Sequence, residues 1–454
     1  MTYEFSALGA LLGLLFAIIL IIKKVPPVYS LILGAFTGGL IGGGGLQATV
    51  DTMITGAQSM MSSVLRIMTS GILAGALIQT GSAEKIAETI VKRLGEKRAL
   101  FAIAAASMIL CAVGVFADIV VITVAPIALA IGNKGRLSCS SILLAMIGGC
   151  KAGNIISPNP NTIAAAEAFS LDLTALILKN VIPAIAALIV TVLLSGFLAK
   201  KARKQCADNA SGQEDAVMGE DAAPRKNAVL GNDAVPKDSM TEPMTEHSAA
   251  SSRSLPTFPA AISGPVVVIL LLALRSLFGI NIDPLLALPL GGLVSILATG
   301  QIRSTISCVE FGLSKVIGVS ILLIGTGTIA GIIKASALQY DVIRLLDLLH
   351  MPAFVLAPLS GILMAGAASS TTAGATIASQ TFAPTLQAQG VPALSAAAMI
   401  HAGSTVLDSL PHGSFFHATG GAVGMSVKDR MKLIPYEACV GLTSTVTSVI
   451  LFLL

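Results

Sequence analysis

Apolar runs long enough to cross a lipid bilayer recur along the whole chain. A membrane-spanning helix needs about 20 mostly apolar residues, and runs of about 17 or more are found from the N-terminal region to the last residues. Only 11% of the residues are charged, against roughly 25% in a soluble domain. The sequence therefore predicts an all-α polytopic membrane protein in contact with the lipid bilayer, and its net charge of +4 does not suggest a nucleic-acid partner.

One apolar run is interrupted by a polar segment, Gly149–Thr162, that cannot continue a helix. It contains Pro158 and Pro160 among asparagines and glycines, all of which disfavour helix. Lipid does not tolerate the freed backbone groups, so the break must be buried in protein or line a polar cavity. Secondary transporters bind substrate and coupling ion at such breaks. The alternative is a loop between two spans, but a similar break recurs at Val406–His417.

The chain divides into two membrane halves. Residues 1–199 are predicted to form the first membrane repeat, and residues 257–454 the second. Residues 200–256 lack apolar periodicity and are rich in charge, Ser and Pro, which predicts a disordered cytoplasmic linker. Each half is predicted to hold five crossings, one re-entrant helical hairpin and one broken helix. An odd number of crossings inverts the second half, so we predict two inverted repeats.

Basic residues predict the orientation of these segments. The apolar segment Leu100–Ile131 has basic clusters at both ends, which predicts a hairpin that enters and leaves on the cytoplasmic side. Its counterpart is Pro352–Leu386, with Ala367–Gly374 at the midpoint. Most basic clusters, including Lys428–Lys432, fall on one side, so both termini are predicted to lie outside.

Three segments outside the crossings have mixed polarity. The Met-rich stretch Gln47–Arg66 is predicted to lie at the membrane interface. The stretches Ala83–Arg98 and Ala335–Leu349 are predicted to be amphipathic helices in corresponding positions of the two halves.

Side chains suited to hold a carboxylate gather in the breaks and at the second hairpin midpoint. Helix ends at these places supply backbone N–H groups and a positive dipole, and hydroxyl and amide side chains add donors. For the Ser/Thr run, close packing of helices by small residues is the alternative. The predicted substrate-binding residues are Asn154, Ser157, Asn159, Asn161, Thr162, Ser369, Ser370, Thr371 and Thr372.

Asp118, Asp408 and His412 are the predicted proton-coupling residues. Ionisable residues at membrane depth are costly and usually face a cavity. Burial disfavours the charged form of a carboxyl group, and histidine changes charge near neutral pH. Asp408 and His412 would share one proton if they lie on one wall, and the alternative is that Asp408 caps a half-helix beside a satisfied histidine. Three other ionisable residues are interpreted as peripheral: Glu167, His350 and His401.

The role of Lys151 stays open at this stage. It lies in the first break, where it can neutralise a substrate, reach towards water, or pair with a carboxylate.

Several other classes of protein lack support in the sequence. H-E-x-x-H, G-x-S-x-G and P-loop patterns do not occur, so we predict neither an enzyme nor an ATP-driven pump. The six cysteines lack the spacing of metal ligands, so no metal site and no cofactor is predicted. An anion channel is a further alternative, against which the repeat and the two separate breaks both argue.

Four stretches follow one another in an order and spacing that are characteristic of a known family. They are Ala76–Ile90, Gly114–Leu129, Ser157–Ala166 and Thr405–Lys432. Together they resemble the gluconate permease (GntP-type) family of the ion transporter superfamily, and the resemblance covers most of both halves without the linker.

The resemblance implies a symporter in the bacterial inner membrane that couples protons to gluconate or a related small hydroxy- or keto-carboxylate. The family typically has a glutamate beside the first-hairpin phenylalanine and a His-Pro-Gly-Pro break. This chain has Ala117-Asp118 and Ser157–Pro160 there, and its histidine is His412 in the second break. A carboxylate other than gluconate, sodium coupling, a homodimer, and an elevator or a rocking motion all remain open.

Overall fold

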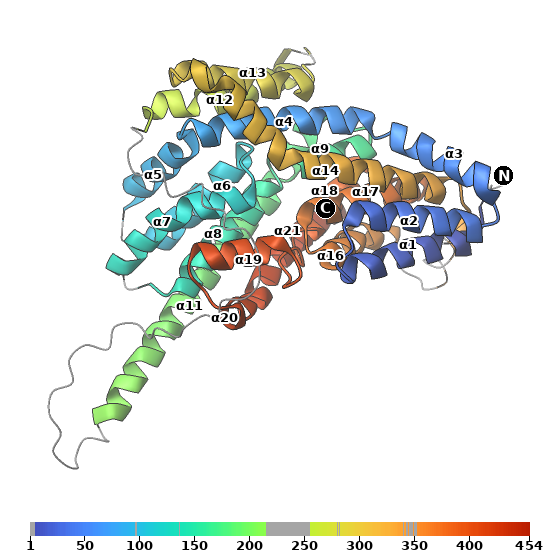
Figure 1. Cartoon of the computed structure of the whole chain (residues 1–454). Coiled ribbons are helices and arrows are strands. Elements are labelled where there is room, and N and C mark those ends of the chain that lie inside the picture. The colour runs from blue at the N-terminus through green and yellow to red at the C-terminus, as the bar shows by residue number, and fades with distance from the viewer. Residues whose placement is uncertain are drawn as a thin grey trace, which may run out of the picture.

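Helices build the fold of this computed structural model (Figure 1). The structure describes residues 5–95, 98–135, 137–214, 255–278, 282–338 and 352–454, with the single positions 280, 340, 341, 344 and 348. Within these residues the regular elements are all helices, and an isolated bridge joins Phe5 to Ser336. The prediction of an all-α chain is therefore confirmed.

The first half of the chain forms helices α1 to α11. They are, in chain order, α1 Ala7–Ile22, α2 Pro27–Ile41, α3 Gly45–Gln58, α4 Met61–Gln79, α5 Ser82–Leu94, α6 Ala99–Ala112, α7 Ala117–Gly135, α8 Cys139–Asn154, α9 Pro160–Ala168, α10 Leu173–Lys179 and α11 Val181–Glu214.

The second half forms α-helices with two short 3-10 turns. They are, in chain order, α12 Phe258–Phe278, α13 Pro284–Ala298, η2 Ile302–Ser304, α14 Thr305–Lys334, η3 Ala353–Val355, α16 Leu356–Ala368, α17 Thr371–Ala388, α18 Ala393–Gly403, α19 Ser414–Ala422, α20 Val427–Met431 and α21 Ile434–Leu453.

Apolar length identifies the helices that can cross a membrane. Among the described residues, four helical stretches are long and apolar enough: Met61–Gln79, Val181–Arg203, Ile302–Lys334 and Val427–Leu453. Helices α9 and α10 together count as a fifth if they form one span bent by 108°. Several other apolar helices have 10–17 residues. The five crossings of each half and the inversion of the second half stay predictions.

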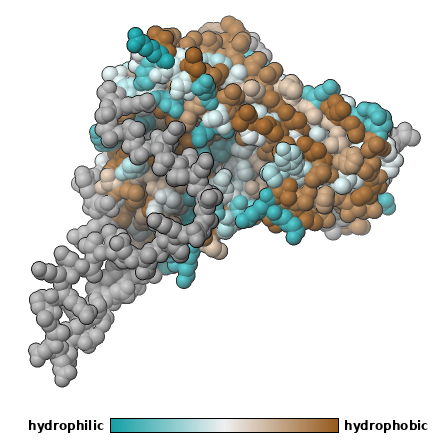
Figure 2. Space-filling view, viewed as in Figure 1, coloured by the Kyte–Doolittle hydropathy of each residue, from teal (hydrophilic) through white to brown (hydrophobic). Residues whose placement is uncertain are grey.

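The outer surface fits a protein surrounded by lipid. Figure 2 shows hydrophobic residues over wide areas of one face, with hydrophilic residues gathered in smaller groups. Leu8, Ile189 and Leu193 are among the exposed large apolar side chains. Apolar exposure of this extent is unusual for a soluble monomer, whose largest apolar patch covers a few hundred Å².

Helix α14 packs closely on α3 and α4 because glycines face one another. A side chain at Gly312 would overlap the backbone at Gly71, and one at Gly56 would meet the backbone of Gly327 and Gly331. Small residues let helix backbones approach closely in membrane proteins. α12 and α13 continue this group of helices along α4, as Figure 1 shows.

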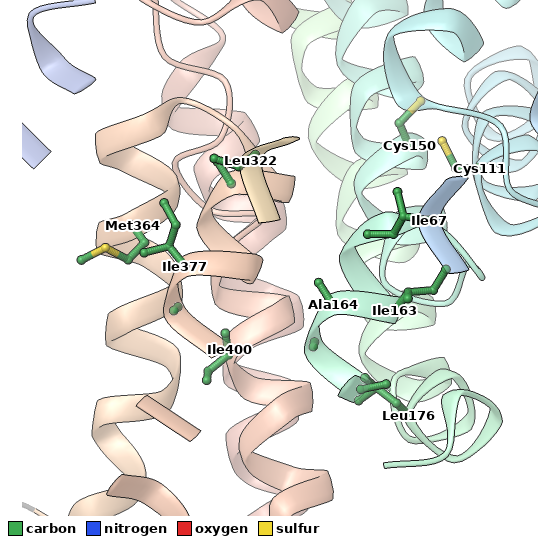
Figure 3. Packing of buried hydrophobic residues seen from close by; sticks show 14 of the residues in the cluster. Ile67, Cys111, Cys150, Ile163, Ala164, Leu176, Leu322, Met364, Ile377 and Ile400 are labelled. Carbon is green, nitrogen blue, oxygen red and sulfur yellow. The ribbon is translucent and has the colours of Figure 1, made fainter. Parts of the chain in front are cut away.

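Two further pairs of helices, one in each half, also pack closely at a glycine. Gly149 on α8 faces the backbone carbonyl of Ala104 on α6, and Gly361 on α16 faces that of Ile400 on α18. Buried apolar residues fill the spaces between these helices, and Figure 3 shows two groups of them. One group includes Ile67, Ile163 and Leu176, and the other includes Met364, Ile377 and Ile400.

Some segments differ from their prediction. Gln47–Arg66 is not one continuous element, because most of it lies in α3, which packs on α14, and α4 begins at Met61. Its position at the membrane interface stays a prediction. α11 continues to Glu214, beyond the predicted start of the linker, and residues 215–254 lie outside the described residues. Seven of the fifteen residues of the predicted amphipathic segment Ala335–Leu349, and His350, also lie outside them.

Candidate functional site

Four helices begin at one cavity of about 220 Å³ in the described part of the chain. They are α7 and α17, which follow the hairpin turns, and α9 and α19, which follow the two breaks. Their first residues line the cavity: Ala117 and Asp118, Pro160 and Asn161, Thr371 and Thr372, Ser414 and Phe415. The positive dipole end makes each helix start favourable for an anion, so the cavity suits a carboxylate.

Local sequence fixes where α9 begins. Asn159 caps the helix by accepting hydrogen bonds at Oδ1 from the backbone N–H groups of Asn161 and Thr162, at 3.0 and 3.1 Å. Pro160 occupies the first helical position, where its missing N–H costs nothing. The predicted break is therefore present between Asn154 and Pro160.

The asparagines of this break bind one another. Asn159 donates through Nδ2 to the backbone and side-chain oxygens of Asn154, and Asn161 donates to the same side-chain oxygen at 3.0 Å. The Thr162 hydroxyl donates to Asn159 at 3.2 Å. Asn154, Asn159 and Asn161 line the cavity, whereas Thr162 is fully buried behind it. Ser157 is buried too, with an unpaired hydroxyl, and is not among the residues that line the cavity.

Ser369 connects the second hairpin turn to the second break. Its backbone lies in the left-handed region, with φ of 46°, between α16 and α17. Its hydroxyl donates to the carbonyl of Leu410 at 2.8 Å and accepts from the N–H of Leu410 at 2.9 Å. This predicted substrate-binding residue therefore links the second hairpin turn to the second break through hydrogen bonds. Ser370, Thr371 and Thr372 line the cavity.

Lys151 and Asp408 form an ion pair at the wall of the cavity. Lys151 lies in the last turn of α8 and donates to Asp408 and to the carbonyl of Thr405. The two residues are only 4% and 5% exposed. Asp408 also accepts hydrogen bonds from Thr371 at 2.6 Å and from Ser409 at 2.9 Å. Of the three roles that the sequence leaves open for Lys151, the structure has it paired with a carboxylate.

Two more charged side chains line the same cavity. Asp118 in the first turn of α7 and Lys315 on α14 are both half-buried. Together with Lys151 and Asp408 they give two positive and two negative groups. The sequence does not predict that Lys315 lies at the cavity, because it is one of several basic residues near an end of an apolar run.

His412 lies apart from this group. Its ring contacts the carbonyl of Ala367 at 3.2 Å, the side chain is exposed, and it is not among the residues that line the cavity. The described contacts of Asp408 are with Lys151, Thr371 and Ser409 instead. The structure therefore does not bring the suggested Asp408–His412 pair together.

The structure contains other buried polar groups that do not line the cavity, and one of them is His401, which the sequence suggested is peripheral. Arg430 and Glu437 form an ion pair and are each 1% exposed. His401 is fully buried in α18, and neither ring nitrogen has a hydrogen-bond partner. Within the described residues, groups of three or more potential metal ligands are absent.

A second, larger cavity of about 630 Å³ lies between α3, α14 and α17. Its walls come from the sides of these helices, and its charged residues are the exposed Asp51 and Lys334. The helix starts and the buried ion pair gather at the smaller cavity, so that cavity is the candidate substrate site.

Comparison with known proteins identifies the family. The family model described as GntP family permease matches residues 5–454. The chain belongs to the GntP family of permeases. An uncharacterized transporter of Haemophilus influenzae is 49% identical over 447 residues, which is 98% of each chain. The predictions of this family, of a transporter rather than an enzyme, and of a multi-pass membrane protein are therefore confirmed.

More distant relatives match less than half of the chain. The inner membrane permease YgbN of Escherichia coli is 29% identical over 36% of this chain and 37% of its own. A gluconate permease of Bacillus licheniformis is 29% identical over 40% of each chain.

Proposed function

We propose that this GntP permease is a secondary active carrier of the bacterial inner membrane that couples protons to the uptake of gluconate or a related small hydroxy- or keto-carboxylate. The observation that carries the proposal is the start of α7, α9, α17 and α19 at one cavity, beside the buried Lys151. Positive helix ends and an ammonium group favour an anion, and the family is one of permeases.

The size of the cavity supports a small substrate. About 220 Å³ is less than the roughly 300–1,000 Å³ of pockets that hold drug-sized ligands. Ser370, Thr372 and Asn161 line it with groups that can bind hydroxyls of the substrate. The relatives named gluconate permeases match about 40% of the chain, so gluconate is one candidate among small hydroxy- and keto-carboxylates.

The arrangement of the two halves supports a carrier over a channel. Each half contributes one helix after a hairpin turn and one after a break, and all four begin at the same cavity. We propose that the halves are inverted repeats around this site, so that access alternates between the two sides of the membrane. Domain boundaries near residues 200 and 256, with the linker inside, belong to the same proposal.

Uptake into proteoliposomes tests this function. We expect labelled gluconate or a shorter hydroxy- or keto-carboxylate to accumulate when a pH gradient, acidic outside, is imposed without sodium. A sodium gradient alone should not support accumulation. Preloading with unlabelled substrate should drive counterflow, which a channel does not show. Accumulation that needs sodium, or uptake without counterflow, would contradict the proposal.

A further inference from the structure

The Lys151–Asp408 ion pair is the most deeply buried charge at the cavity. It joins α8 of the first half to the second break, across 257 positions of sequence. A buried ion pair is weak as a source of stability, because the loss of hydration offsets much of the attraction. Both residues line the cavity. The pair therefore has access to whatever the cavity binds.

We propose that this pair exchanges both of its partners during transport. A proton binds the carboxylate of Asp408 in place of Lys151, and the substrate carboxylate binds the ammonium group of Lys151 in place of Asp408. The inference rests on the proposed function, because it assumes a carboxylate substrate and a coupling proton. It identifies where each of them binds.

Charge balance makes this exchange a coupling mechanism. The empty site contains Lys151⁺ and Asp408⁻, and the loaded site contains Lys151⁺, a neutral Asp408 and one substrate carboxylate. Both states have the same net charge. A site with the substrate alone, or with the proton alone, differs by one charge in a place that is shielded from water. An uncompensated charge at membrane depth is unfavourable. Only the empty and the fully loaded protein should therefore switch the site easily from one side of the membrane to the other.

Other charged and titratable groups surround the pair. Asp118 on α7 and Lys315 on α14 line the cavity with opposite formal charges, and the buried Cys150 thiol is next to Lys151 on α8. On the side of α21, which contacts Thr405, Glu437 is paired with Arg430. In α18 and the second break, the titratable groups are His401 and His412.

The hydrogen bonds of the Asp408 carboxylate support it as the group that binds the proton. One oxygen accepts from Lys151 and Ser409, and the other from Thr371. The hydroxyls of Ser409 and Thr371 can turn, so a protonated Asp408 keeps hydrogen bonds when Lys151 leaves. Lys151 keeps the carbonyl of Thr405 and gains the substrate.

The exchange also restricts the class of substrate. One proton compensates one negative charge, so the fitting substrate is a monocarboxylate. A dicarboxylate would leave one negative charge in the loaded site and should be transported poorly. Uptake of a monocarboxylate should be electroneutral, so clamping the membrane potential with valinomycin and potassium should change its initial rate by less than twofold.

The dependence of substrate binding on pH tests the exchange. We would measure the Kd of the purified full chain for the monocarboxylate that is taken up best. If binding requires one proton, the Kd rises tenfold for each pH unit above the protonation midpoint. Asp408→Asn leaves Lys151 free at every pH, so its Kd should be low and constant. This variant should exchange substrate but should lose accumulation driven by a pH gradient.

Ser409→Ala is the second variant. Ser409 is buried, is not among the residues that line the cavity, and donates to the charged form of Asp408. Its loss should make protonation easier and move the midpoint of the Kd profile upward by about one pH unit or more. Asp51→Asn, at the second cavity, is the control and should keep both the tenfold slope and the midpoint.

The outcomes separate the two proposals. If the wild type binds and accumulates a monocarboxylate, but Asp408→Asn keeps the tenfold slope, the exchange is wrong and the function stands. If Asp408→Asn does not fold, an unshifted midpoint in Ser409→Ala likewise rules out the exchange. A shifted midpoint with electroneutral uptake supports the exchange. A wild type that neither binds nor accumulates any carboxylate overturns the proposed function itself.

Discussion

At the scale of single residues, Lys151 and Asp408 depend on each other for stability. Removing one partner of a buried ion pair typically costs about 3–5 kcal/mol, because the other charge remains buried. We expect Lys151→Met to lower the free energy of unfolding by roughly this amount near pH 8.

The double variant Lys151→Met, Asp408→Asn is the matched control. It removes both charges and keeps groups that bind Thr371 and Ser409, so it should be more stable than Lys151→Met at pH 8 and should show little dependence on pH. Thermal unfolding of the purified protein in detergent, followed at several pH values, measures this. Equal loss in the single and double variants would mean that the pair does not control stability.

The sequence predicts part of this site and leaves part of it open. Thr371, Asn159 and Asp408 are recognisable because hydroxyl, amide and carboxyl groups are costly in apolar surroundings and stand out at helix breaks. The partner of Lys151 is not recognisable, because Thr405 and Asp408 are more than 250 positions away and only folding brings them together. The predicted pairing of Asp408 with His412 is absent from the structure. The two residues are four positions apart in an irregular segment, and such a segment does not fix where a side chain points.

At the scale of helices, α14 depends on glycine where it crosses α4. A methyl group at Gly312 would overlap the carbonyl of Gly71. Overpacking a close contact typically costs about 1–3 kcal/mol, so we expect Gly312→Ala to lower the midpoint of thermal unfolding clearly. Recovery of the monodisperse peak in size-exclusion chromatography after heating measures the midpoint.

Gly318 provides the control on the same helix. An added methyl group there would meet nothing within 4 Å. Alanine favours helix over glycine by up to about 1 kcal/mol, so Gly318→Ala should be neutral or stabilising. A midpoint that falls equally in both variants would show that glycine at 312 is not required for close packing.

Helix boundaries were predictable where the signal is local. Pro158 and Pro160 cannot continue a helix, and α8 ends before them at Asn154. The close packing of α3 on α14 was not predictable, because Gln47–Arg66 is polar enough to suggest an interface, and its partner glycines, Gly327 and Gly331, lie far away in sequence. The residue pattern within a segment therefore predicts that a helix forms and where it ends. It does not predict which other helices that helix packs against, because those helices lie far away in the sequence.

At the scale of the whole molecule, the linker is expected to be dispensable. α11 runs to Glu214, so a deletion should begin after that residue to leave the helix intact. We expect removal of residues 216–252 to leave the initial rate of substrate uptake within about twofold, because polar, charged segments of this composition add little packing. Uptake by cells that express equal amounts of both chains measures this. Loss of uptake with normal membrane insertion would assign the linker a role in transport.

The orientation of the protein rests on the distribution of basic residues. Arg430 weakens one cluster, because it is buried against Glu437 and does not count as a basic residue beside the membrane. The other clusters still predict that residues 200–256 lie inside. Asp51 and Lys334 line one cavity, so they lie on the same side, and we expect that side to be outside.

Cysteine labelling in intact cells tests this orientation with two matched positions. In a chain whose six cysteines have been replaced, Asp51→Cys should react with a membrane-impermeant maleimide, because residue 51 is exposed and is expected to face outwards. Ser239→Cys, in the linker, should react only after the membrane is permeabilised. Each variant must still take up substrate, so that labelling reports the native orientation. Labelling of Ser239→Cys in intact cells would place the linker outside. An inverted second half requires the linker and the second cavity, which Asp51 lines, to lie on opposite sides of the membrane. Labelling of both positions from outside would therefore also refute the inverted repeat.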